Sequence, residues 1–162
     1  MLPLRLVYVL ALAVWLGGMT ILGGVVAPSI FQTLQSADAD TGRAMAGLAF
    51  GVILTRFHLV AYGCGLLLLV TLIAMALLGP RPTHFAIRCG IVAGMLMVSV
   101  YSGVVVLGEI DAIQREVGTL PSRLPEGDPR RIRFDALHQL STRLMMVDLF
   151  GALVLLYWEA RE

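Results

Sequence analysis

Apolar residues along this chain are grouped in four long blocks, with shorter stretches of polar residues, proline and glycine between them. The blocks cover about residues 4–27, 56–78, 85–107 and 138–158. A helix needs about 20 apolar residues to cross the hydrocarbon core of a bilayer, which is roughly 30 Å thick. The pattern therefore predicts an all-α integral membrane protein, a single domain in which four transmembrane helices form an antiparallel bundle.

The helical pattern extends beyond the apolar blocks at one end of the bundle. The first helix is expected to end near Pro28, before a polar stretch. Residues 41–55 precede the second block as an interfacial or projecting helix, and Asp40 and Thr41 are candidate caps for its start. The third pattern continues well past its block, and the fourth helix is expected to begin near Ile132. Helices two to four should therefore project beyond the bilayer on the side of the two longer connections.

The composition agrees with a membrane protein. Of the 162 residues, 58% are hydrophobic and 14% are charged, whereas a soluble domain carries about 25% charged residues. Four spans use most of the length, so a separate catalytic domain does not fit and an enzyme is not the leading expectation. The formal net charge of +1 gives no electrostatic case for nucleic acid. Cys64 and Cys89 lie at different predicted depths, so both are expected to be packing residues without a disulfide.

The arginines indicate an orientation. Because the connections are short, the N-terminus, the turn at Pro80 and the C-terminus should share one end, and the two longer connections the other. The arginines near the longer connections are Arg43, Arg115, Arg123, Arg130, Arg131 and Arg133. The positive-inside rule then favours a cytoplasmic location for that end. Ionisable residues close to the membrane are expected there too, and the other end is expected to be nearly bare.

Polar residues form stripes on three predicted helices. The stripe on the fourth helix consists of Phe134, His138, Ser141, Met145, Asp148 and Ala152, at alternating spacings of four and three. The third helix carries Ser99, Ser102 and Glu109 along a similar line. On the second helix, Tyr62 lies one turn from His58. Polar stripes on apolar helices should face inward, so they predict a polar pocket that opens towards the longer connections.

Two arginines are expected at the same end as this pocket. Arg56 and Arg143 can pair with Glu109 or Asp111, or reach lipid phosphate. Ion pairing is the preferred interpretation.

Asp148 is the least expected residue of the sequence. Its distance from the interfacial pair Tyr157 and Trp158 puts it about 15 Å into the bilayer, where a carboxylate costs several kcal/mol. Trp15 lies at a similar depth, and its indole N–H needs an acceptor. We therefore expect a hydrogen bond from Trp15 to Asp148, with Ser99 near. Two interpretations remain open: a polar clamp that fixes helix register, and a proton or ligand site.

Histidine and glycine spacings suggest two further features. His58 and His138 are candidate ligands for the iron of haem b or for a copper ion, since imidazole suits both, although hydrogen bonds at the interface would also explain them. The glycine spacings, such as Gly90 with Gly94, are typical of close helix packing within or between chains.

Short motifs resemble a known family. The motifs are Val14-Trp15-Leu16-Gly17-Gly18, Val26-Ala27-Pro28-Ser29-Ile30-Phe31 and Leu137-His138-Gln139-Leu140-Ser141. They are similar to the uncharacterised bacterial four-helix membrane family related to animal transmembrane protein 205. The resemblance implies a multi-pass protein of the bacterial inner (plasma) membrane, with Trp15, Gly18, Pro28, His138 and Ser141 among the characteristic positions. A more distant similarity is to copper-resistance D-type proteins and to membrane protoporphyrinogen oxidases, which hold haem with histidine.

Three hypotheses about function follow. The leading one is a non-enzymatic bundle that binds or transports a small molecule or ion at the polar pocket. The second is a redox protein with haem or copper. The third is a structural subunit of a larger membrane complex. The bilayer is a partner in each case, and a homo-oligomer is compatible with all three.

Overall fold

The computed structural model describes residues 2–39, 41–118 and 121–161, and this part of the chain contains helices and no strand. Four helical segments are long and apolar enough to cross a membrane: Leu2–Ala37, Gly42–Leu78, Phe85–Val117 and Pro129–Glu159. At 1.5 Å per residue each is about 45–55 Å long, well beyond the roughly 30 Å hydrocarbon core. The predicted all-α bundle of four membrane-spanning helices is confirmed.

The first segment is longer than the sequence suggested. It comprises α1 (Leu2–Ile21), a π-helical turn η1 (Leu22–Val26) and α2 (Ala27–Ala37). Pro28 does not end this helix. Proline lacks an N–H and collides with the carbonyl of the preceding turn, and the wider π turn directly before it provides the extra room. The first helix therefore projects beyond the bilayer, as helices two to four do.

A tight hairpin joins α2 to α3 (Gly42–Leu78). The carboxylate of Asp38 accepts hydrogen bonds from the backbone N–H and the hydroxyl of Thr41. A side chain on Gly42 would put its Cβ 1.9 Å from the carbonyl oxygen of Leu34, so only glycine allows this close approach. Thr41 precedes the helix as predicted but makes no capping bond with its side chain, and Asp40 lies outside the described residues.

The third segment contains a second π-helical turn. It comprises α4 (Phe85–Val100), the π turn η2 (Tyr101–Val106) and α5 (Leu107–Val117). Its start is marked by His84, whose φ of 54° lies in the left-handed region and whose ring stacks on Trp158. Its end is marked by Gly118, with φ 63°, a conformation that glycine adopts without strain.

The fourth segment, α6 (Pro129–Glu159), follows a short 3-10 turn, η3 (Pro121–Arg123). It begins three residues before the predicted Ile132, because Asp128 caps it by accepting a hydrogen bond from the backbone N–H of Arg130. The Arg130 side chain also donates to this carboxylate. These hydrogen bonds hold the pKa of Asp128 below its ordinary value.

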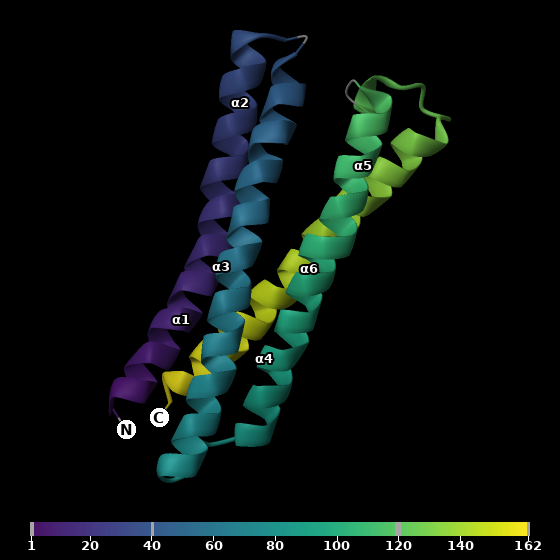
Figure 1. Ribbon diagram of the computed structural model, residues 1–162. Coiled ribbons are helices and arrows are strands. Elements are labelled where there is room, and N and C mark those ends of the chain that lie inside the picture. The colour runs from purple at the N-terminus through teal and green to yellow at the C-terminus, as the bar shows by residue number, and fades with distance from the viewer. Residues whose placement is uncertain (1, 40, 119–120, 162) are drawn as a thin grey trace.

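The helices run antiparallel, with both termini and the α3–α4 turn at one end (Figure 1). The core lies in this half, where α1, α3, α4 and α6 meet, and its largest fully buried apolar side chains include Trp15, Leu12, Leu68 and Leu155. In the other half α2 packs on α3, and α5 packs on α6, as two separate hairpins. As predicted, the two termini and the turn at Pro80 lie at the same end of the bundle.

Candidate functional site

A pair of polar side chains lies in the core between α4 and α6. The hydroxyl of Ser99 donates a hydrogen bond of 2.6 Å to Oδ2 of Asp148. Both residues are 4% exposed. The sequence placed Asp148 at mid-bilayer depth and predicted Ser99 near it, and in the structure the two side chains are hydrogen-bonded.

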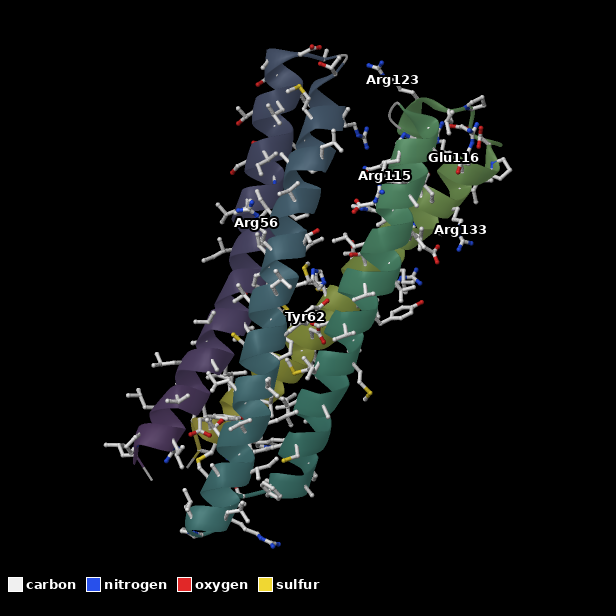
Figure 2. The ribbon with its side chains drawn as sticks, in the orientation of Figure 1. Arg56, Tyr62, Arg115, Glu116, Arg123 and Arg133 are labelled. Carbon is white, nitrogen blue, oxygen red and sulfur yellow. The ribbon has the colours of Figure 1, made fainter. Side chains whose placement is uncertain are left out.

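The π turn η2 packs against two side chains of α3. A Cβ built on Gly103 would lie 2.2 Å from the Tyr62 hydroxyl and 2.7 Å from Cδ2 of His58. The Tyr62 hydroxyl also donates to the backbone carbonyl of Ser99, at 3.4 Å. Figure 2 shows Tyr62 between α3 and the third segment. His58, Tyr62, Ser99 and Asp148 therefore lie close together as one polar cluster, and the approach of η2 to His58 and Tyr62 depends on the missing side chain of Gly103.

The predicted hydrogen bond between Trp15 and Asp148 is absent. Among the described residues, Nε1 of Trp15 and Oδ1 of Asp148 are both buried and have no hydrogen-bond partner. The indole lies against Gly65, which Leu96 contacts from α4, so Trp15 is at a similar level to Ser99. Trp15 therefore lies near the level of Ser99, but its indole N–H does not bond to the Asp148 carboxylate.

The two histidines have different surroundings. His58 is buried, and its Nδ1 faces the carbonyl oxygen of Leu54 at 2.8 Å. His138 is exposed and stacks on Phe134 of its own helix. It lies ten residues before Asp148, or about 15 Å along α6, whereas His58 is one turn from Tyr62. This arrangement does not fit one metal or haem iron between the two imidazoles. Among the described residues, no group of three or more His, Cys, Asp and Glu side chains could hold a metal ion.

The remaining predicted site residues are on the projecting half. Arg56 and Arg143 are exposed, and neither has an ion pair with another described residue. The carboxylate of Glu109 is paired with Arg133 instead, and Ser141 is half-buried. The single inward pocket that was predicted is thus divided into a closed core cluster and a charged outer surface.

That outer surface has a shallow groove of about 400 Å³ between α5 and α6. The groove is lined by Glu109, Ala112, Ile113, Glu116, Pro129, Arg130 and Arg133. Figure 2 shows Arg133 and Glu116 beside it on the projecting hairpin. Its acidic and basic side chains are largely engaged with one another, as in the pair Arg130 and Glu116 at 3.9 Å.

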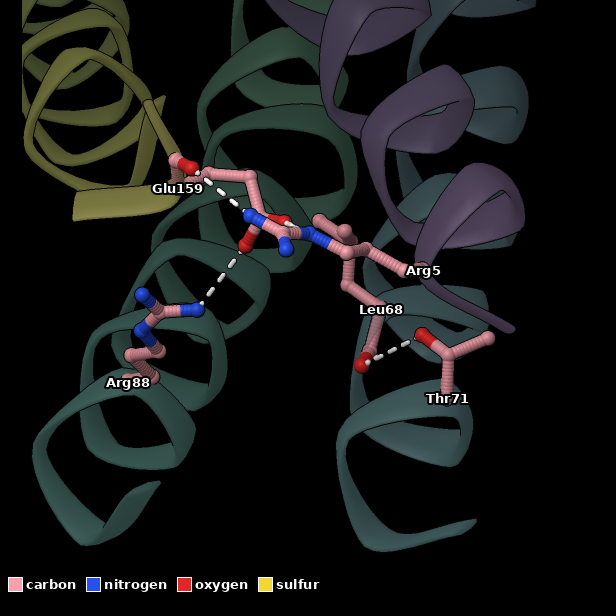
Figure 3. A network of polar contacts seen from close by, with 5 residues as sticks. All are labelled: Arg5, Leu68, Thr71, Arg88 and Glu159. Atoms are coloured by element: carbon pink, nitrogen blue, oxygen red, sulfur yellow. Dashed lines mark hydrogen bonds and ion pairs between the residues drawn. The ribbon is translucent and has the colours of Figure 1, made fainter. Parts of the chain in front are cut away.

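An ion cluster at the opposite end was missed from the sequence. Nη1 of Arg88 lies 2.9 Å from Oε2 of Glu159, and the Arg5 guanidinium pairs with the other carboxylate oxygen (Figure 3). Arg88 is fully buried. The expectation that this end is nearly bare was wrong, because three helices bring single charges together there. One indication of this cluster was present in the sequence. In an antiparallel bundle, Arg5, Arg88 and Glu159 all lie at the end that carries the termini.

The glycines fall into two groups. Gly18 packs on Phe57 and Gly151 packs on Met95, so these positions serve packing within the chain. Gly90 and Gly94 have no neighbouring atom of the described residues within 4 Å of a built Cβ. Packing within the chain therefore applies to Gly18 and Gly151, whereas packing of Gly90 and Gly94 against another chain stays a prediction.

The cysteines are both free, Cys64 buried and Cys89 half-buried, as the sequence predicted. Neither adds a chemical group to the polar cluster.

Comparison with known proteins identifies the family. No curated protein and no solved structure matches the chain. The family described as "Domain of unknown function (DUF4149)" matches residues 10–118, more than half of the 162 residues. The match covers Trp15, His58, Tyr62 and Ser99, and it ends before α6, which carries Asp148. The chain therefore belongs to the DUF4149 family.

Proposed function

We propose that this multi-pass membrane protein binds or carries a small molecule or ion at the polar cluster of His58, Tyr62, Ser99 and Asp148. Binding is coupled to proton uptake and release at Asp148. The observation that supports this proposal is the half-satisfied carboxylate, with Oδ2 bonded to Ser99 and Oδ1 buried without a partner among the described residues.

The physical argument concerns the cost of a buried charge. A carboxylate inside a bilayer costs several kcal/mol unless it is paired or protonated. Within the described residues, no basic side chain forms an ion pair with Asp148. A purely structural clamp would satisfy both oxygens, because an unsatisfied buried acceptor is destabilising. The open oxygen is therefore suited to a proton or to a donor group of a ligand.

The test is infrared difference spectroscopy of the purified protein between acidic and neutral buffer. Protonation of a buried carboxyl group gives a carbonyl band that shifts in heavy water. We expect this band in the native protein and in Asp135→Asn, which removes an exposed carboxylate of the same helix. The band should be missing in Asp148→Asn. If Asp148→Asn keeps the full band, Asp148 is not the titrating group and the proposal is wrong.

The expected location is the bacterial inner membrane, with the longer connections in the cytoplasm. This location rests on the resemblance to the family related to transmembrane protein 205 and on the arginine distribution. Labelling of single cysteines placed in the Asp38–Thr41 and Gly79–Pro82 connections, on opposite sides of intact membranes, distinguishes the two orientations.

A further inference from the structure

The open oxygen of Asp148 limits which ligands the polar cluster can take. Asp148 is 4% exposed, its Oδ2 accepts the hydrogen bond from Ser99, and its Oδ1 is buried without a partner among the described residues. Within the same residues, no basic side chain forms an ion pair with it. An uncompensated charge is strongly disfavoured at this depth. The carboxyl group is therefore favoured either with a proton or with a cation beside it.

Charge balance separates three classes of ligand. An anion would add a second negative charge unless the proton stays on Asp148. A neutral molecule leaves the charge unchanged, so it does not displace the proton. A monovalent cation replaces the proton one for one and keeps the site neutral. Because the function proposed for Asp148 couples binding to proton release, a cation is the class of ligand that meets this requirement.

The oxygens of the carboxylate favour a cation that donates a hydrogen bond. Oδ1 can accept from the N–H of an ammonium group, in a charge-assisted hydrogen bond, while Ser99 keeps Oδ2. A metal ion such as calcium takes six or more oxygen ligands, or roughly that number. The described residues contain no group of three or more His, Cys, Asp and Glu side chains that could hold a metal ion. The site therefore fits a protonated amine better than a metal ion.

The core beside the carboxylate contains flexible apolar side chains. Met145 lies one turn before Asp148 on α6, and its Cε is 3.3 Å from the position of a Cβ built on Gly23. Met19 and Met95 belong to the same core. Methionine is unbranched and flexible, so it adjusts to groups of different shape. These side chains can therefore cover a small apolar substituent on the amine.

We propose that the ligand of this site is a small protonated amine with an apolar substituent, and that it exchanges for the proton of Asp148. The proposal rests on the function proposed for Asp148. In the free protein the carboxyl group carries the proton. Binding forms a hydrogen bond from the ammonium N–H to Oδ1 and releases the carboxyl proton to water, so one cation enters for each proton that leaves. The reverse exchange returns the proton.

Other ionisable side chains lie on the segments packed around Asp148. They are Arg5 and Tyr8 on α1, His58, Tyr62 and Cys64 on α3, Arg88 and Cys89 on α4, Tyr101 on η2, and Arg143, Tyr157 and Glu159 on α6. Arg5 and Arg88 pair with Glu159 at the end that carries the termini, and Tyr101, Arg143 and Tyr157 are exposed. Protonation of His58 would repel a cation in the same cluster. Acid therefore opposes binding through either group, and the carbonyl band of Asp148 distinguishes the two.

The test is titration of the purified protein in detergent with benzylammonium, followed by calorimetry and by a pH indicator in weakly buffered solution. About one proton should be released for each cation bound, and the infrared carbonyl band of Asp148 should disappear on binding. The apparent affinity should fall about tenfold per pH unit while Asp148 is protonated, because one proton competes with one cation. Asp135→Asn should behave like the native protein, and Asp148→Asn should release no proton.

Two further probes carry the same benzyl group and test the chemistry of recognition. Benzyl alcohol is neutral and should release no proton. Benzyltrimethylammonium has the charge but no N–H, so it should bind about tenfold or more weakly than benzylammonium, as expected when a hydrogen bond to a charged group is lost. Equal affinity of the two cations would contradict the hydrogen bond to Oδ1.

The outcomes separate this proposal from the proposed function. If the native protein shows the pH-dependent carbonyl band but benzylammonium neither binds nor releases a proton, the amine proposal is wrong and the titration of Asp148 stands. The amine proposal is also wrong if benzyl alcohol releases as many protons, or if Asp148→Asn still releases one. If no pH-dependent band is found, both proposals are wrong. The native protein with the three probes carries the test if Asp148→Asn does not fold.

Discussion

Loss of the Glu159 charge should destabilise the bundle more than loss of any exposed charge at the same end. The change is Glu159→Gln, which keeps the shape of the side chain and removes its charge. In the native protein Glu159 is 7% exposed and pairs with Arg88, which is fully buried. The substitution removes the Glu159 charge from this pair while the arginine charge stays in the core.

The expected magnitude follows from this burial. Breaking a buried ion pair by removing one partner costs about 3–5 kcal/mol. The glutamine oxygen can still accept a hydrogen bond from Arg88, so we expect the lower end, a loss of about 3 kcal/mol in the free energy of unfolding. The Arg5 side chain is 40% exposed, and water screens its share of the cluster. Arg5→Gln should therefore cost about 1 kcal/mol at most.

The assay is equilibrium unfolding in mixed micelles with increasing SDS, monitored by circular dichroism. Arg81→Gln is the control, because this arginine is exposed in the turn at the same end and its loss should change the free energy by about 0.5 kcal/mol or less. Replacing both buried partners, in Arg88→Met with Glu159→Met, should cost less than Glu159→Gln alone, since no charge is then stranded. Equal losses for Glu159→Gln and Arg81→Gln would refute the reasoning.

Two further predictions concern the fold. Gly18→Ala should lower the thermal stability in detergent, because its Cβ would lie 2.3 Å from the Phe57 ring. The control is Gly17→Ala, which has open space around it and should leave stability unchanged or raise it slightly through helix propensity. Equal effects of the two substitutions would contradict the packing of Gly18 on Phe57. Acidification should fray the start of α6. The pKa of Asp128 is lowered by its bonds from Arg130, so its capping is complete above the ordinary aspartate pKa and is lost as the pH falls through the lowered value. Hydrogen exchange of the first turn of α6 measures this loss, and Asp128→Asn, which still caps, should remove most of the pH dependence.

The helices and the depths of their residues could be predicted because both depend only on position along the helix axis. Apolar length gives the spans, and the rise per residue gives the depth. Ser99 and Asp148, on helices far apart in the chain, were expected near each other and are bonded in the structure. Depth does not say how each helix is rotated about its own axis, and this rotation decides which way a side chain faces. Trp15 was placed at the right level, but the direction of its N–H was not predictable from depth alone.

The two π turns explain other differences from the sequence prediction. A π turn adds about one residue to a helical turn, so the residues after it are rotated by roughly 100° relative to a regular α-helix. Glu109 follows η2 and no longer shares the face of Ser99. It pairs with Arg133 on the projecting hairpin instead. In the first helix, η1 allows the chain to continue past Pro28. Regular helical periodicity does not reveal either turn.

The contrast between the two buried acidic groups is the reason for proposing a function at Asp148. Glu159 is compensated by two guanidinium groups, and its loss would remove a carboxylate from the buried Arg88. Asp148 has one neutral donor, Ser99, and an open oxygen. Its neutral form avoids the cost of a buried charge, whereas its charged form keeps only the one hydrogen bond from Ser99. Gly103 of the second π turn packs against Tyr62, whose hydroxyl donates to the backbone carbonyl of Ser99. The proposed function needs an acid without a basic partner, and among the described residues Asp148 is buried, forms no ion pair and has one oxygen without a hydrogen-bond partner.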